Sequence, residues 1–497
     1  MNLLDLQFIG FVLSVFFLYF IAPRSLRWVL LLIANFVFYW LVGGWLSALI
    51  VGVTSLICWI GARILGHMRS RKVKRGLLRV PLVLSLLAIF SMLLLFRHAG
   101  FIFPRFNLLM VVGISFYAFQ ATGYLVDVYV GRVSPEGNVF KTALFLSFFP
   151  QLVQGPIARH SEVAKDLFAG HAWNWDRARS GIQRIIWGYF MKLVVADRAA
   201  MVVGTVLGAH TDYGGAVIFF ALFLYSVQIY ADFAGGISVT LGIAQILGVV
   251  KLPENFRQPF FAISVGDFWR RWHMSLGSWL RDYLFYPITI SKPMGKLSIA
   301  ARKRLGLRIG KILPVTIATY VIFIVIGIWH GASWQGLVFG LSCGTIIAAS
   351  QFFEPNVDKL CKKLGIRRAF GFWRLFAIGR TILIMVLLRY FTLSPSLPTA
   401  LSMLRRTFSA PNLGQLRDGT LFSLGLERFD YIVLFAGFGI ILLYDFIAER
   451  YRAPFAALDE KPKSLQFLLT FLLIAAITIF GIYASEAFSA AFIYGQL

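Results

Sequence analysis

The stretch LPVTIATYVIFIVIGIWHGASWQGLVFGL, residues 313–341, contains the features that decide the fold. Residues 313–328 are predominantly apolar, and about 20 such residues cross the hydrocarbon core of a bilayer as a helix. His330 follows this run between Trp329 and Trp334. An ionisable side chain at membrane depth usually faces a cavity or the interior of the helical bundle. The stretch therefore predicts a membrane span that ends at a chemically unusual position.

The composition of the whole chain supports the same interpretation. Of its 497 residues, 59% are hydrophobic and 14% are charged, and the mean hydropathy is +0.76. Soluble globular proteins carry about 25% charged residues. We therefore expect an all-α polytopic membrane protein, in which one helical domain can use the full length of the chain.

Eleven segments have the length and the apolar character of membrane spans. They are residues 8–22, 28–42, 46–65, 80–96, 108–128, 216–247, 313–328, 336–350, 375–388, 432–446 and 465–484. No cleavable signal peptide is evident, because no A-x-A site follows the first apolar run. We expect about 11 transmembrane helices together with one or two half-inserted segments.

The net charge of +26 arises from 48 Lys and Arg against 22 Asp and Glu. Two basic loops, residues 63–79 and 291–311, each contain seven Lys or Arg and no acid. Basic loops are retained on the cytoplasmic side and face anionic lipid. We therefore predict that both loops are cytoplasmic, that the N-terminus lies outside, and that the charge reflects membrane lipid rather than a nucleic-acid partner.

Two segments in the middle of the chain depart from the pattern of simple spans. Residues 145–163 are apolar but broken by Pro150, Gly155 and Pro156, which indicates a re-entrant segment whose backbone is covered by protein or water. Residues 175–198 carry basic and apolar side chains at helical spacing, which is typical of an interfacial amphipathic helix.

Two of the seven histidines stand apart from the others. We interpret four of the others as solvated loop residues, namely His67, His98, His171 and His210. His160 follows the broken segment, and we interpret its position there as having no functional meaning. If residues 269–276 are helical, Trp269, Trp272, His273 and Leu276 share one face. His273 and His330 could then be buried histidines bonded to backbone carbonyls, or functional groups.

The chemistry open to two such histidines is acid–base chemistry. An imidazole accepts a proton near physiological pH, so one could activate a hydroxyl for attack on an acyl thioester. The second could orient the reactants or donate to the developing oxyanion. We expect no metal, because two histidines without a third ligand do not make a zinc site and no HExxH motif is present. No Walker A motif is present either, which argues against an ATP-driven pump.

Several long motifs, in order, resemble the membrane-bound O-acyltransferase (MBOAT) family. The two principal ones are FWRRWHMSLGSWLRDYLFYP, residues 268–287, and GIWHGASWQGLVFG, residues 327–340. The supporting ones are GISFYAFQATGYLVDVYVGR, SFFPQLVQGPIAR, YADFAGG and LPENFRQPF. The similarity covers nearly the whole chain and is strongest to the bacterial branch of alginate O-acetylases and the D-alanine transfer proteins of teichoic acids.

The resemblance implies a helical bundle with a central tunnel, open to both sides of the membrane, in which His330 is the essential histidine. His273 then occupies the second active-site position. Trp269, Trp272 and Trp329 are expected to wall the tunnel, and Arg281 and Asp282 to contribute an ion pair or positioning group beside it. We expect one integral-membrane domain over residues 1–497, with N-terminal spans in 1–130, a catalytic core in 131–350 and C-terminal spans in 351–497.

The implied reaction moves an acyl group, with acetyl favoured, from a cytoplasmic thioester to an extracellular or cell-wall polysaccharide. The donor would be an acyl-CoA such as acetyl-CoA, or an acylated carrier protein, with no bound cofactor. We expect the bacterial cytoplasmic (inner) membrane as the location, and an extracytoplasmic SGNH-type acetylase or another accessory protein as partner.

Two segments differ from the alginate-type pattern and leave the acceptor open. GISVT, residues 236–240, replaces a more polar segment, and PITISKP, residues 287–293, replaces PLGGNR. D-alanyl transfer to teichoic acid from a carrier-protein thioester is therefore one alternative. A transporter of small solutes is the alternative from another class, because paired histidines at membrane depth also suit proton coupling, although no internal repeat is found.

Overall fold

The computed structural model describes residues 5–102, 111–152, 154–329, 333–366, 368, 371–451 and 461–483. In these ranges the chain is helical, and its one β-type pairing is an isolated antiparallel bridge between Phe256 and Trp272. The helices form two compact units, which are described separately. An all-α polytopic fold is confirmed.

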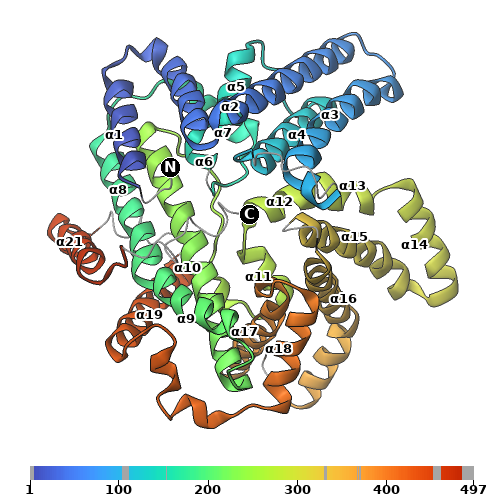
Figure 1. Cartoon of the computed structure of the whole chain (residues 1–497). Coiled ribbons are helices and arrows are strands. Elements are labelled where there is room, and N and C mark those ends of the chain that lie inside the picture. The colour runs from blue at the N-terminus through green and yellow to red at the C-terminus, as the bar shows by residue number, and fades with distance from the viewer. Residues whose placement is uncertain are drawn as a thin grey trace. The chain divides into compact units, whose positions relative to one another are not determined.

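Unit 1 contains the chain up to Gly188 together with Gly236–Glu254. Its helices are α1 (Leu6–Ile21), η1 (Arg24–Leu26), α2 (Arg27–Ser70), α3 (Arg75–Ile102), α4 (Ile114–Val130), α5 (Val139–Ser147), α6 (Phe149–Leu152), α7 (His160–Ala169), α8 (Trp175–Tyr189) and the last part of α10 (Gly215–Leu247). In this unit α2 packs against α3, α4 and α5 (Figure 1).

Unit 2 contains Tyr189–Gly235 and the described residues from Asn255 to residue 483. Besides the first part of α10, its helices are η2 (Phe190–Ala196), α9 (Asp197–Gly208), η3 (Pro259–Phe261), α11 (Val265–Arg271), α12 (Met274–Leu280), η4 (Arg281–Phe285), α13 (Tyr286–Thr289), α14 (Lys292–Leu305), α15 (Leu307–Trp329), α16 (Trp334–Lys363), α17 (Phe372–Leu393), α18 (Leu397–Ser409), η5 (Leu413–Leu416), η6 (Thr420–Ser423), α19 (Arg428–Tyr451) and α21 (Lys463–Phe480).

Eight helices in the described part of the chain are long and apolar enough to cross a membrane. One of them, α2, contains two of the eleven predicted spans, because its 44 residues are interrupted at Gly44, where φ is 69°. Glycine adopts this left-handed conformation without the steric penalty that a side chain would add. The chain is a multi-pass membrane protein, while the count of about 11 spans stays a prediction.

The α15–α16 pair positions the end of the predicted catalytic span. The two helices lie side by side (Figure 1), and a Cβ atom at Gly327 would lie 2.4 Å from the carbonyl oxygen of Gly336. A Cβ atom at Gly340 would meet the carbonyl oxygen of Phe323 at 2.2 Å. Glycine at these two positions therefore lets the helix backbones approach closely, next to Trp329 at the end of α15.

The broken segment of unit 1 has the interruptions that its prolines and glycine predicted. Helix α5 ends at Ser147, α7 begins at His160, and residues 154–159 are not helical. The side chains of Gln151 and Gln154 in this region are buried. The backbone is therefore covered by protein, as irregular structure at membrane depth requires, and re-entry into a membrane stays a prediction.

Three predictions for basic segments need correction. Residues 63–79 are not one loop, because α2 continues to Ser70 and α3 begins at Arg75, and His67 and His98 lie in these two helices rather than in loops. Residues 175–198 are helical, but every residue of η2 (Phe190–Ala196) is buried, so this part of the segment is not an interfacial helix. Residues 291–311 are helical rather than a loop, because Ser291 caps α14 by accepting a hydrogen bond from the N–H of Met294 and basic residues occupy the last turn of that helix. Both features stabilise a helix.

Candidate active site

His273 lies at a break between two short helices. The side chain of Ser264 caps α11 by accepting a hydrogen bond from the N–H of Asp267, and α11 ends at Arg271. Trp272 is extended, with φ −104° and ψ 128°, and His273 is left-handed, with φ 47° and ψ 53°. The prediction of one continuous helical face through Trp269, Trp272 and His273 is therefore wrong.

The neighbouring segment of LPENFRQPF explains why the helix breaks here. Asn255 accepts hydrogen bonds at its backbone oxygen from the N–H of Met274, at 2.9 Å, and at Oδ1 from the N–H of Ser275, at 3.0 Å. The N–H of Arg257 also donates to the carbonyl oxygen of Arg271 at 2.9 Å. These long-range bonds hold the backbone on both sides of His273. A left-handed non-glycine residue costs about 1–3 kcal/mol and persists where its surroundings impose it.

Aromatic rings surround the imidazole of His273, which is 2% exposed. The ring of Phe233 meets it edge to face at a centroid distance of 4.9 Å, and the ring of Trp329 lies 6.1 Å away. Trp329 immediately precedes His330 in the sequence, and His330 itself lies outside the described residues. The fold thus brings the two predicted active-site segments together at Trp329.

The other two predicted tunnel tryptophans contact different partners. Trp269 packs edge to face against Phe323, with a centroid distance of 5.3 Å. Trp272 stacks on Phe268 at 5.4 Å, and the guanidinium of Arg389 lies 5.4 Å from its ring centroid. A cavity of about 20 Å³ borders Trp272, which is room for about one water molecule. A tunnel that admits an acyl chain therefore stays a prediction.

Arg281 and Asp282 form an ion pair at the start of η4. The Nε atom of Arg281 lies 3.3 Å from Oδ1 of Asp282, and the two side chains are 56% and 18% exposed. An exposed pair between neighbouring residues contributes little to stability. Their predicted place beside a substrate tunnel is not tested by this geometry.

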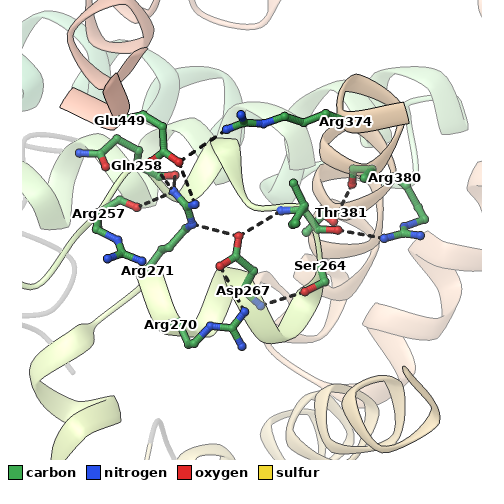
Figure 2. A network of polar contacts seen from close by, with 12 residues as sticks. Arg257, Gln258, Ser264, Asp267, Arg270, Arg271, Arg374, Arg380, Thr381 and Glu449 are labelled. Carbon is green, nitrogen blue, oxygen red and sulfur yellow. Dashed lines mark hydrogen bonds and ion pairs between the residues drawn. The ribbon is translucent and has the colours of Figure 1, made fainter. Parts of the chain in front are cut away.

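An ionic network centred on Arg271 was not predicted from the sequence (Figure 2). The Nε atom of Arg271 donates to Asp267 at 3.0 Å, and its two terminal nitrogens donate to the carboxylate of Glu449 at 2.7 and 3.0 Å. Glu449 lies 178 residues away near the end of α19. This bidentate pairing ties α11, and hence the turn at His273, to α19.

A second buried ionic cluster lies on η2, α9 and α10. The ammonium of Lys192 is 2.9 Å from Asp197 and 2.7 Å from Asp232, and all three side chains are buried. Nearby on α10, the hydroxyl of Tyr230 donates to Asp445 at 2.8 Å. Polar residues in the apolar run of α10 were the available signal for this cluster, because buried charges in membrane proteins are paired.

Comparison with known proteins identifies the family to which this sequence is similar. The model of the membrane-bound O-acyltransferase family matches residues 136–302. The probable alginate O-acetylase of Pseudomonas fluorescens is 32% identical over 384 residues, which are 73% of this chain and 74% of that protein. A peptidoglycan O-acetyltransferase of Helicobacter pylori is 30% identical over 56% of this chain and 57% of its own length. A teichoic acid D-alanyltransferase of Bacillus subtilis is 28% identical over 50% and 61%.

The fold and these matches define a multi-pass membrane enzyme that transfers acyl groups to hydroxyls. The chain belongs to the membrane-bound O-acyltransferase family. The matched region contains His273 and the turn around it, while His330 lies beyond residue 302. The specific roles of both histidines therefore remain proposals.

Proposed function

We propose that this enzyme transfers an acetyl group from a cytoplasmic thioester to a hydroxyl of an extracytoplasmic polysaccharide. Relatives named as an alginate O-acetylase and a peptidoglycan O-acetyltransferase both act on polysaccharides, which favours acetyl and a polysaccharide acceptor. The relative that transfers D-alanine matches a smaller share of this chain. We further propose the bacterial cytoplasmic membrane as the location and an SGNH-type acetylase as the accessory partner.

His330 is proposed as the general base and His273 as the second active-site group. In this mechanism the acceptor hydroxyl attacks the thioester carbonyl while His330 takes its proton. The resulting tetrahedral intermediate collapses, the C–S bond breaks, and His330 returns the proton to the leaving thiolate. His273 orients the reactants or donates to the oxyanion. Trp269, Trp272 and Trp329, with the Arg281–Asp282 pair, are proposed to line the path of the substrate.

The strained turn at His273 is the observation that carries this proposal. Backbone strain clusters at sites where function requires a fixed side-chain position. Here the strain places an imidazole among aromatic rings, 6.1 Å from the ring of Trp329, which immediately precedes His330. A merely packed histidine would not need a left-handed backbone held by bonds from a distant segment.

The surface of the Arg271 network is proposed to attract the donor. Five arginines gather there with two carboxylates, those of Asp267 and Glu449 (Figure 2). Two of these arginines, Arg257 and Arg270, are exposed and lie outside the helices that are long and apolar enough to cross a membrane. Such a surface would raise the local concentration of coenzyme A phosphates or of an acidic carrier protein, and salt would weaken the attraction.

A direct assay of the purified protein tests the proposal. Radiolabelled acetyl-CoA and a D-alanyl carrier protein would be offered in parallel in detergent, with wild type and His330→Ala compared. We expect acetyl transfer or hydrolysis that requires His330 and a donor encounter that slows as ionic strength rises. Preferential use of the D-alanyl carrier would instead support the teichoic acid alternative. If neither donor is turned over with the proposed accessory protein present, while a small solute crosses the bilayer of proteoliposomes that contain the enzyme, the transporter alternative is supported.

A further inference from the structure

Asn255 is held in a single orientation against the turn that carries His273. Its side chain is 0% exposed, and its Oδ1 accepts the N–H of Ser275 at 3.0 Å. Rotating the amide by half a turn would place its NH2 group against that same N–H donor. The hydrogen bonds therefore assign Oδ1 and Nδ2 and fix the direction in which Nδ2 points.

The Nδ2 group of Asn255 is buried, and among the residues that the structure describes it has no hydrogen-bond partner. Leaving a buried donor unsatisfied costs about 1–3 kcal/mol. Most buried polar groups in native proteins are paired, so an exception calls for an explanation. Asn255 lies beside the candidate active site. One explanation for the unpaired Nδ2 group is therefore that it donates a hydrogen bond to an atom of the bound substrate.

That position is set by the backbone around His273. The backbone oxygen and Oδ1 of Asn255 bind the N–H groups of Met274 and Ser275, the two residues that follow His273. The same turn directs the imidazole toward Phe233 and Trp329. Asn255 and His273 are thus fixed relative to one another by one rigid element, as a pair of catalytic groups requires.

Building on the proposed acyl transfer, we propose that Asn255 is a further catalytic residue whose Nδ2–H donates to the carbonyl oxygen of the reacting acyl group. When the acceptor oxygen bonds to the carbonyl carbon, the π electrons move to this oxygen and the hydroxyl proton goes to His330. The negative oxygen is then stabilised by Asn255. When the C–S bond breaks, the carbonyl re-forms and the thiolate takes the proton.

The substitution Asn255→Asp separates this role from a structural one. It keeps an oxygen that can accept the N–H of Ser275 and nearly the same volume, but it replaces the NH2 donor. We expect kcat to fall by about 10²–10³, the usual effect of removing one oxyanion donor, once the introduced carboxyl is ionised. The ratio of the variant's kcat to that of wild type at the same pH should rise as the pH falls, because a protonated carboxyl donates again.

Asn35 of unit 1 provides a matched control. It is also 0% exposed, and its Oδ1 accepts the N–H of Phe149 at 3.0 Å, but its Nδ2 donates to Ser147 at 3.1 Å. Asn35→Asp introduces the same chemical change at a site whose bonds are all structural. We expect it to lower the thermal unfolding midpoint in detergent while the folded protein keeps the wild-type kcat and pH profile.

The outcomes distinguish this proposal from the proposed function. Wild-type turnover together with a pH-dependent loss of kcat in Asn255→Asp, but not in Asn35→Asp, would support it. Wild-type turnover with an unchanged kcat in Asn255→Asp, or a loss that only follows the fraction folded, would overturn the role of Asn255 alone. If wild type turns over no acyl donor, the proposed function fails and the role of Asn255 fails with it.

Discussion

His160 of unit 1 and His273 of unit 2 have similar surroundings but different backbones. Both are buried, at 8% and 2% exposure. His160 packs against Tyr124 and Phe145 at centroid distances of 4.6 and 5.1 Å, much as His273 packs against aromatic rings of its own unit. His160 is the first residue of the regular helix α7, whereas His273 is left-handed between two helices.

The difference teaches that burial among aromatic rings does not by itself mark a functional histidine. Neither ring nitrogen of His160 has a hydrogen-bond partner in the described part of the chain. Burial lowers the pKa of His160 to about 4, although the charge of Glu136 acts in the opposite direction. His160 is therefore neutral at physiological pH and contributes packing. Conformational strain, maintained by bonds from a distant segment, is the feature that separates His273 from it.

The largest expected effect is that of His330→Ala, which should abolish acyl transfer because the reaction loses its base. The measurement is the acyl content of cell-surface polymer, with the amount of enzyme in the membrane determined alongside. Wild-type acylation in this variant would remove His330 from the mechanism and would leave His273 without its proposed partner.

A smaller effect is expected at His273. His273→Ala should lower kcat by about 10²–10³, as for loss of an orienting or donor group. His273→Asn should be less affected, because asparagine keeps a donor and tolerates a left-handed backbone. The comparison is made on purified proteins of equal thermal stability. If both variants have the kcat of wild type, His273 contributes only to packing, as His160 does.

His160→Phe should leave kcat unchanged and alter only the dependence of stability on pH. In wild type the unfolded chain binds a proton at His160 below about pH 6.5, while the folded chain does so only near pH 4. Stability should therefore fall as the pH drops from about 6.5 toward 4, by an amount on the order of 2–3 kcal/mol from this group. The variant should lose this contribution, as unfolding midpoints across that range would show. A lower kcat at neutral pH would make His160 more than a packing residue.

No labelling is expected when the two basic segments are probed from outside. In a background without the buried Cys58, Cys343 and Cys361, single cysteines would be placed at Ser70 in unit 1 and Ala300 in unit 2. Both positions are exposed, and both should be cytoplasmic because their segments are basic and free of acids. If a membrane-impermeant thiol reagent labels either cysteine on intact cells, the predicted cytoplasmic location of that segment is wrong.

The sequence by itself determined the fold class and the family. Hydrophobic runs long enough to cross a bilayer indicate membrane helices from composition alone, because in lipid the backbone N–H and C=O groups must form their hydrogen bonds within each segment. The sequence also located the non-helical segment at Gly155 and Pro156, because proline and glycine act through their own backbone geometry, whereas Pro150 lies inside α6. The motif around His273 could be recognised without knowing its conformation.

Only the tertiary structure decided that the helix stops before His273. Periodicity predicted a continuous helix, but the N–H groups of Met274 and Ser275 bond to Asn255 instead of continuing the helix through that turn. In the same way, Glu449 reaches Arg271 across 178 residues. Such bonds depend on which distant segments come into contact in the folded protein. A sequence pattern indicates the local preference of each segment for helix, but it does not indicate the distant residues whose hydrogen bonds override that preference.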